Sequence, residues 1–136
     1  MNNIKIVDSL SAEDLYSLRE SLGWKLLSIE QLERALKNTM CLVSIMKDGK
    51  CIACGRVVGD FSAKGVLSDI LVHPDYQKYG KLVLTHLLKR IEDILSSGEQ
   101  FQLEVTPTYG NREFYVKCGM KYKPENQDGV YVWIKK

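Results

Sequence analysis

The sequence predicts an α/β fold in which about four helices pack on a mixed, mostly antiparallel sheet of six to seven strands. Three apolar-rich runs between residues 41 and 73 are separated by turn residues, as in an antiparallel meander. A long segment with helical periodicity follows at residues 82–95, and another strand-like run comes directly after it at residues 101–105. Strand, long helix and strand in succession imply one parallel pair in the sheet.

Length and composition set limits on the kind of protein. The 136 residues fit one domain, residues 1–136, and a net charge of +2 gives no electrostatic reason to expect nucleic acid binding. No apolar run approaches the ~20 residues that span a bilayer, and the N-terminus lacks the apolar core of a secretion signal. We therefore expect a cytoplasmic protein that binds neither nucleic acid nor membrane, with its four cysteines reduced.

The elements before and after the meander follow from local signals. After a short first strand, Ser11 and Asp14 begin one helix in a pattern close to a capping box, and Ser28 and Gln31 begin the next. In the meander, the turn Lys47-Asp48-Gly49 predicts a hairpin. The expected strands cover residues 41–46, 51–58, 65–73, 101–105 and 130–134, and a short helix covers 111–117 before a glycine cap at Gly119.

Cys51 and Cys54 form a C-x-x-C motif, which is typical of zinc or redox sites. The chain has no second C-x-x-C and no nearby histidine pair to complete four ligands. The motif also lies in an expected strand, where residues three apart point to opposite faces. We therefore interpret the two cysteines as small apolar residues of a sheet and expect no metal site.

A polar loop joins the third strand of the meander to the long helix. It runs His73-Pro74-Asp75-Tyr76-Gln77-Lys78-Tyr79-Gly80-Lys81. The backbone N–H groups at a helix N-terminus have no partners within the helix, and the helix dipole adds positive charge there. A phosphate or pyrophosphate suits such a position, although an ordinary strand–turn–helix connection explains the residues equally well.

Two segments resemble the motifs of the GCN5-related N-acetyltransferases (GNAT). Val72-His73-Pro74-Asp75-Tyr76 followed by Gln77-Lys78-Tyr79-Gly80 is similar to the acetyl-CoA loop of that family. Asn111-Arg112-Glu113-Phe114-Tyr115-Val116-Lys117-Cys118-Gly119-Met120 is similar to its Phe-Tyr-x-Lys-x-Gly-Phe segment, with methionine in place of the last phenylalanine. The order of elements is also similar along essentially the whole chain. The resemblance implies a GNAT-like fold, in which the central parallel strands splay apart.

The resemblance also implies which residues hold acetyl-CoA. Backbone groups of Leu71 and Val72 would pair with the pantetheine arm, with Asn111 as a further contact. The loop amides would hold the pyrophosphate; they belong to Gln77, Lys78, Tyr79, Gly80, Lys81 and Leu82. Leu82 departs from the family pattern, which has a small residue there so that the backbone can approach the pyrophosphate closely. Its side chain must therefore point away from the ligand.

The catalytic groups are implied in the same way. Tyr115 matches the family's acid, which protonates the departing thiolate, and a tyrosine with a pKa near 10 can supply that proton. The attacking amine must lose a proton to Asp69, to Glu104 or Ser68, or to a water chain. Ser68 and Asp69 are adjacent on a strand and cannot both face the substrate unless a bulge intervenes. His73 and His86 are interpreted as structural.

The acceptor is expected to be a primary amine of a small molecule or a peptide. Trp24 lies between the first two helices and would form one wall of its site, with Arg56, Asp60, Tyr109 and Trp133 as weaker candidates. Many members of the family form homodimers, and this stays open here. The alternative hypothesis is a non-catalytic acyl-CoA-binding or interaction module on the same fold, because fold alone does not define function.

Overall fold

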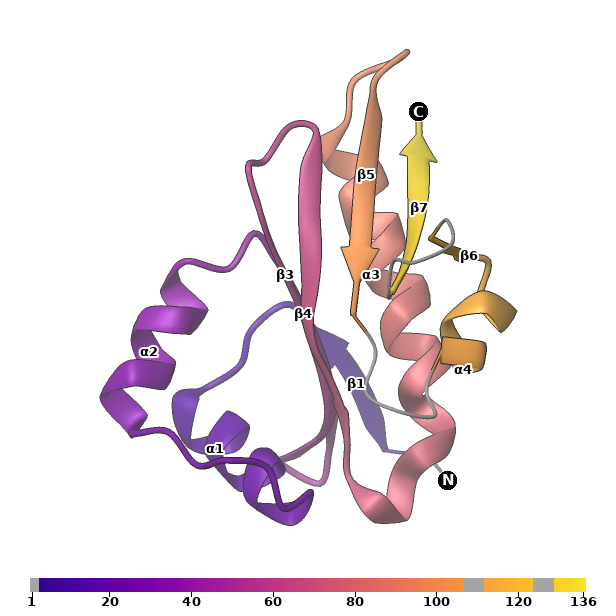
Figure 1. Ribbon diagram of the computed structural model, residues 1–136. Coiled ribbons are helices and arrows are strands. Elements are labelled where there is room, and N and C mark those ends of the chain that lie inside the picture. Colours follow the sequence, from indigo (N-terminus) through magenta and orange to yellow (C-terminus); the bar gives the residue numbers. More distant parts are fainter. Residues whose placement is uncertain (1–2, 107–111, 124–128) are drawn as a thin grey trace.

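A seven-stranded sheet separates two layers of helices (Figure 1). The computed structural model describes residues 3–106, 112–123 and 129–136, with the side chain of Asp69 also outside the description. Helices α1 (Ala12–Ser21) and α2 (Ile29–Lys37) lie on one side of the sheet, and α3 (Gly80–Ile94) and α4 (Arg112–Lys117) lie on the other. The mixed sheet and the four helices confirm the fold predicted from the sequence.

The strand order is β1-β2-β3-β4-β5-β7-β6, and β4 and β5 form the parallel pair. Every other neighbouring pair is antiparallel. A six-residue 3₁₀ segment, η1 (Pro74–Tyr79), connects β4 to α3. The strands are β1 (Ile4–Val7), β2 (Cys41–Lys47), β3 (Lys50–Gly59), β4 (Lys64–Val72), β5 (Gln100–Val105), β6 (Lys121–Tyr122) and β7 (Val130–Lys135).

Local signals in the sequence act as expected. Ser11 Oγ accepts a hydrogen bond from the Asp14 N–H at 3.0 Å, and Ser28 Oγ accepts one from the Gln31 N–H at 3.1 Å. Both serines therefore satisfy an orphan amide at the start of a helix. In the β2–β3 hairpin, Asp48 and Gly49 both have positive φ, 50° and 79°, as a two-residue type I′ turn requires.

The core has two parts, one on each face of the sheet. The larger part lies under α3 and includes Leu84, Leu87, Ile91 and Phe101, each at most 1% exposed. The smaller part lies under α1 and α2, and its buried members are Ala12, Leu15, Leu18, Leu32, Cys51, Cys54 and Leu71. Because residues on β4 alternate between these two parts, the strand is held on both faces while its edge stays accessible for pairing.

The parallel strands separate soon after they begin. β4 pairs with β5 only where Lys64, Gly65 and Val66 face Gln102, Leu103 and Glu104. On its other edge β4 stays paired with β3 as far as Val72. Within the described residues, the second half of β4 thus has a strand partner on one side only. This splay, which the family resemblance implied, opens a gap in the middle of the sheet.

Two β-bulges alter which residues share a face. Between β3 and β4 the register moves from Arg56 opposite Asp69 to Val57 opposite Leu67, so Ser68 is the extra residue. Between β2 and β3 it moves from Ile45 opposite Ala53 to Met46 opposite Cys51, so Ile52 is the extra residue. An extra residue shifts the alternation of the strand by one. The expectation that Cys51 and Cys54 point to opposite faces is therefore wrong: both are buried in the part of the core under α1 and α2.

Candidate functional site

A cavity of about 380 Å³ lies at the open end of the gap beside β4. Its walls come from the loop after α1, from β4, from η1 and the start of α3, and from α4. The residues that line it are Leu22, Trp24, Ile70, Val72, Gln77, Gly80, Phe114 and Tyr115. Of the residues predicted from the sequence, the structure thus brings together Trp24, Val72, Gln77, Gly80 and Tyr115. Segments far apart in the chain meet here because the splay leaves space between β4 and β5.

Among residues 3–106, 112–123 and 129–136, the second half of β4 has no strand partner on the side of the gap, and alternate residues present their backbone groups along that edge. Val72 lies opposite Ala53, and the next bond in the ladder joins the His73 N–H to the Ile52 carbonyl at 2.8 Å. In an antiparallel ladder this makes Val72 a non-hydrogen-bonded position, whose backbone groups point away from β3. By the same alternation, Ile70 points its backbone groups into the gap and Leu71 points its own toward Cys54 on β3.

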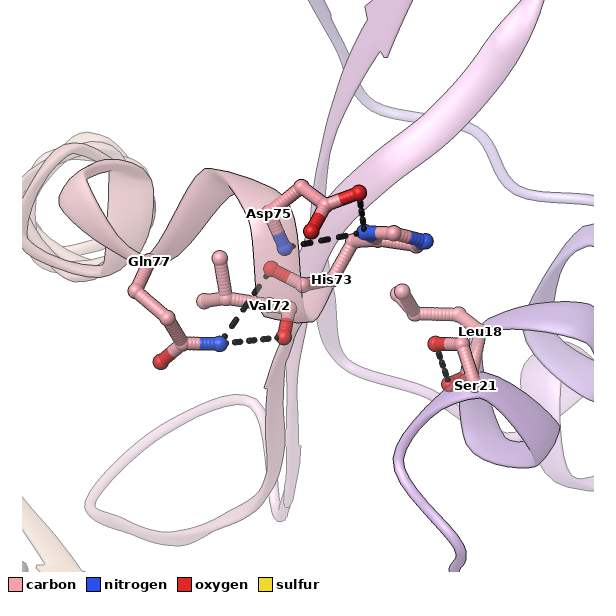
Figure 2. A network of polar contacts seen from close by, with 6 residues as sticks. All are labelled: Leu18, Ser21, Val72, His73, Asp75 and Gln77. Carbon is pink, nitrogen blue, oxygen red and sulfur yellow. Dashed lines mark hydrogen bonds and ion pairs between the residues drawn. The ribbon is translucent and has the colours of Figure 1, made fainter.

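Side chains around His73 hold the turn after β4 in place. Gln77 Nε2 donates to the carbonyl oxygens of Val72 at 2.7 Å and His73 at 3.2 Å (Figure 2). His73 Nδ1 accepts a hydrogen bond from the Asp75 N–H at 3.1 Å, so its imidazole caps the turn. The Nδ1 atom therefore acts as an acceptor, which agrees with the structural interpretation of His73.

The first turn of α3 is open and carries no negative charge. Tyr79, in the N-cap position, makes no side-chain cap, and the first turn has no acidic residue. Lys78 places its Nζ 5.2 Å from the centre of the Tyr79 ring, and Lys81 is exposed. The N–H of Gly80 donates to the Gln77 carbonyl, and the first turn of α3 otherwise combines the absence of a side-chain cap with nearby cations. Such a helix start fits an anionic group.

Gly80 and Leu82, both in the first turn of α3, differ in what surrounds their side-chain positions. A Cβ added at Gly80 would lie 3.3 Å from Cζ of Phe114, so a side chain there would press on the wall of the cavity. Leu82 is half-buried, and its side chain packs against the core under α3. The leucine that departs from the family pattern is thus accommodated by the core.

Tyr115 is a buried titratable side chain that lines the cavity. It is 8% exposed, and its ring packs edge-on against Phe114 with centroids 5.1 Å apart. Burial, with a smaller contribution from Cys118, raises its pKa to about 12. The pKa is thus higher than the ordinary value near 10 expected from the sequence, because the phenolate would be poorly solvated. Tyr115 therefore keeps its proton throughout the physiological range.

The candidate bases occupy different environments. Glu104 lies 3.2 Å from Lys123 Nζ and 3.4 Å from Lys64 Nζ. The hydrogen bond from Lys123 contributes most to lowering its pKa, so the carboxylate stays ionised and is a weak proton acceptor. Ser68 is the exposed bulge residue, and its hydroxyl accepts a hydrogen bond from Arg56 Nη2 at 3.3 Å.

Three predicted candidates lie partly or wholly outside the described residues. The backbone of Asp69 is described and pairs with Arg56 next to the bulge, which removes the geometric objection to Ser68 and Asp69 facing one way. The side chain of Asp69 is outside the description, and so are Asn111 and Tyr109.

Trp24 forms the wall of the cavity opposite α4. The guanidinium of Arg19 lies 5.4 Å from the centre of the Trp24 ring, and Arg19 also donates to the Lys25 carbonyl at 2.8 and 3.2 Å. The guanidinium, held by the Lys25 carbonyl, therefore stacks on the indole and helps to orient it.

Sequence reasoning missed three residues that line the cavity: Leu22 after α1, Ile70 on β4 and Phe114 on α4. Ile70 lies two positions before Val72 and so shares its orientation along the gap, a relation that period-two counting could have found. Phe114 was seen only as part of a motif, and its position against Gly80 depends on how α4 packs. Within the described part of the chain, no three His, Cys, Asp or Glu side chains gather as a metal site. No helix of residues 3–106, 112–123 or 129–136 is long and apolar enough to cross a membrane.

A splayed mixed sheet with an open helix start beside the gap is the architecture of acyl-CoA-dependent acetyltransferases. A model of the acetyltransferase (GNAT) family matches residues 6–120, and the chain therefore belongs to that family. By family it is an N-acetyltransferase that depends on acetyl-CoA.

Individual proteins agree with this assignment. The chain is 22% identical over 132 residues to the uncharacterized N-acetyltransferase ycf52 of Pyropia yezoensis, covering 90% of this chain and 72% of that protein. A crystal structure of a probable acetyltransferase of unknown function from meticillin-resistant Staphylococcus aureus has a TM-score of 0.79 at 27% identity, covering 95% and 98% of the two chains. N-acetylglutamate synthase from Neisseria gonorrhoeae, solved with coenzyme A and N-acetyl-glutamate, shares the fold at a TM-score of 0.70 and 17% identity, over all of this chain and 36% of that one.

Proposed function

We propose that this protein transfers the acetyl group of acetyl-CoA to a primary amine of a small molecule or peptide, by direct attack of the amine when both substrates are bound. The observation that carries the proposal is the free edge of β4 leading directly into the open start of α3, with Tyr115 in the cavity between them. When bound, acetyl-CoA supplies an acetyl group activated as a thioester.

The residues present fit that ligand. Ile70 and the N–H of Val72 offer backbone groups along the gap, as an added strand would require, while the Val72 carbonyl already accepts from Gln77 Nε2. Leu71 supports this edge through its bonds to β3. The amides from Gln77 to Leu82 and the charge of Lys81 suit a pyrophosphate. Gly80 leaves the space that a Cβ would otherwise fill against Phe114. Asn111 is retained as a further contact on the strength of the family motif.

Tyr115 is proposed as the catalytic residue that donates to the departing thiolate. Complete proton transfer from a group of pKa about 12 to a thiolate of pKa ~8.5 is uphill by roughly 5 kcal/mol. We therefore propose that Tyr115 first stabilises the thiolate by a hydrogen bond from its hydroxyl.

The incoming amine must lose a proton, and the cavity walls limit what can accept it. Glu104 is the weakest of the candidates because two lysines hold its carboxylate ionised. We propose Asp69, assisted by a water chain along the bulge at Ser68, as the acceptor of that proton. The amine itself would lie against Trp24.

Calorimetric titration with acetyl-CoA, followed by mass spectrometry of an amine panel, tests the proposal. We expect one-to-one binding in the micromolar range, about −8 kcal/mol, and an acetylated product. Tyr115→Phe should lower kcat at least about a hundredfold and change the Kd of acetyl-CoA less than about threefold. Tyr122→Phe is the matched control, because Tyr122 is 45% exposed and does not line the cavity.

The results separate the two functional hypotheses. Binding without turnover across the panel would favour an acyl-CoA-binding module. An unchanged kcat in Tyr115→Phe would remove Tyr115 from the mechanism, and no binding at millimolar acetyl-CoA would reject the transferase hypothesis altogether.

A further inference from the structure

The C-x-x-C motif of β3 is not used by the acetyl-transfer site. Cys51 and Cys54 would point to opposite faces of a regular strand, but the extra residue at Ile52 brings both under α1 and α2. The two thiols are hydrogen-bonded to each other, and the Cys51 thiol also donates to the Ala53 carbonyl at 3.2 Å. Because of the bulge, the two cysteines of the C-x-x-C motif lie next to each other on one face of the sheet.

The pair lies at the base of a second cavity. This cavity, of about 610 Å³, lies between α1, the β2–β3 hairpin and η1, and Cys51 and Ile52 form part of its wall. Cys51 is 9% exposed and reaches the cavity, whereas Cys54 behind it is 2% exposed and does not. The position of each thiol assigns it a different role: Cys51 is reachable, and Cys54 supports it.

The pKa of Cys51 is lowered on balance, although the bond that its thiol donates to the Ala53 carbonyl is made only by the protonated form. The hydrogen bond from Cys54 contributes most to the lowering, burial opposes it, hydrogen bonding at Ala53 and more weakly at Ser44 lowers the pKa further, and the Asp14 charge raises it. The other thiols differ: burial raises the pKa of Cys41 and of Cys118. Because the thiolate is the reactive form, Cys51 differs chemically from both.

We propose that Cys51 is a modification site, the attacking thiol of a Cys51–Cys54 pair that captures a disulfide of low molecular weight entering from the cavity between α1 and η1. The Cys51 thiolate forms a bond to one sulfur of the small disulfide, the disulfide bond breaks, and the other half departs as a thiolate that takes up a proton. The chain gains a mixed disulfide on Cys51, and the small disulfide supplies the oxidising equivalents.

Both positively and negatively charged residues line the cavity. This charge distribution determines which disulfide reagent is suitable as a probe. Lys47 and Lys50 come from the hairpin, Asp14 from α1, Asp48 from the turn, and His73 and Asp75 from the end of β4 and the start of η1. Figure 2 shows the imidazole of His73 turned toward Leu18 and Ser21 of α1, which line the same cavity. Because no single sign dominates, a small neutral disulfide is the appropriate reagent.

The experiment exposes the native full-length chain to bis(2-hydroxyethyl) disulfide near neutral pH and maps adducts by mass spectrometry after quenching with acid. Exposure alone favours Cys118, since it is half-buried and Cys51 is buried. We expect the opposite order, with Cys51 reacting at least severalfold faster than Cys118 or Cys41, because its pKa is lowered, theirs are raised, and the thiolate is the reactive form. Mapping is repeated in Cys54→Ser, which cannot displace the adduct to form an internal disulfide.

Two variants at Cys54 test its supporting role. Cys54→Ser keeps a hydrogen-bond donor and should react at Cys51 within about twofold of the native rate. Cys54→Val removes the donor at similar volume and should slow the reaction roughly three- to tenfold. Circular dichroism, together with the reactivity of buried Cys41, reports whether either variant has lost its fold.

Two results would overturn the proposal. One is modification of Cys118 or Cys41 as fast as Cys51. The other is a rate at Cys51 that stops rising with disulfide concentration, because that plateau marks attack only after unfolding. Neither result depends on acetyl-CoA, so the thiol site and the acetyl-transfer site are tested separately.

Discussion

The helices α1 and α2 begin in a different way from α3. α1 and α2 each start with a serine whose hydroxyl accepts an amide hydrogen bond, and each has acidic residues in its first turn. α3 starts without a side-chain cap or an acidic residue, and Lys81 stands in its first turn. In α1 and α2 a serine hydroxyl thus satisfies one amide of the first turn, whereas the start of α3 has no side-chain cap and carries positive charge. A helix start left open beside a gap in the sheet indicates a ligand site.

The largest expected effect on stability comes from Tyr115, whose side chain lines the same cavity as the start of α3. Tyr115 has a folded-state pKa of about 12 and an ordinary value near 10 when unfolded. Between those pH values the unfolded chain has lost a proton that the folded chain retains, so stability falls as pH rises. The native chain should lose about 3 kcal/mol of unfolding free energy relative to Tyr115→Phe between pH 9 and pH 13. Chemical denaturation across that range measures it, and parallel curves for the two chains would contradict it.

Leu82 separates the stability of α3 from its role as a ligand site. Leu82→Gly should destabilise the protein by about 2 kcal/mol, since it removes a half-buried leucine and places glycine in a helix. Because the side chain already packs against the core, the Kd of acetyl-CoA should not fall. Urea denaturation and calorimetry give the two values. Tighter binding in the variant would mean that the leucine obstructs the ligand.

A negative charge placed in the first turn of α3 would remove its difference from α1 and α2. Lys81→Glu gives α3 the acidic first turn of α1 and α2, and should weaken acetyl-CoA binding about tenfold or more, at least ~1.4 kcal/mol. The matched control is Glu30→Lys at the first turn of α2, where no change in binding is expected. Equal effects of the two variants in calorimetry would show that only net charge matters.

The smallest effect is expected at a capped helix. Ser28→Ala removes the hydroxyl that accepts from Gln31 and should cost about 1 kcal/mol of unfolding free energy. The Kd of acetyl-CoA should stay the same, because α2 does not line the cavity of Tyr115. Thermal denaturation and calorimetry on one preparation test both expectations. A loss of acetyl-CoA binding in this variant would mean that α2 contributes to the binding site.

Features controlled by neighbouring residues were predictable from the sequence. The caps at Ser11 and Ser28 and the turn at Asp48 and Gly49 depend on a few adjacent positions, and all were confirmed. The family resemblance added the splay of β4 and β5 and the loop residues. Caps and turns of this kind depend on the geometry of a few adjacent residues, and tertiary packing does not change it here.

Features that depend on a partner strand or on burial were not predictable. The bulge at Ile52 arises from the register of β3 on β2, so period-two counting assigned Cys51 to the wrong face. The high pKa of Tyr115 arises from the way α4 packs, which no motif expresses. Whether the backbone groups of Ile70 face the gap depends on which residues of β4 are hydrogen-bonded to β3. That alternation can be assigned only when the pairing of the two strands is known.

The gap beside β4 also bears on aggregation. Unpaired strand edges normally recruit strands from other chains, and sheets protect their rims with charges, bulges or short strands. Among the described residues, the stretch of β4 beyond its pairing with β5 lies within the sheet rather than at its rim, with β3 bonded on its other side. A strand inside a sheet is flanked by further strands, so this stretch is less open to strands from other chains than a rim strand would be.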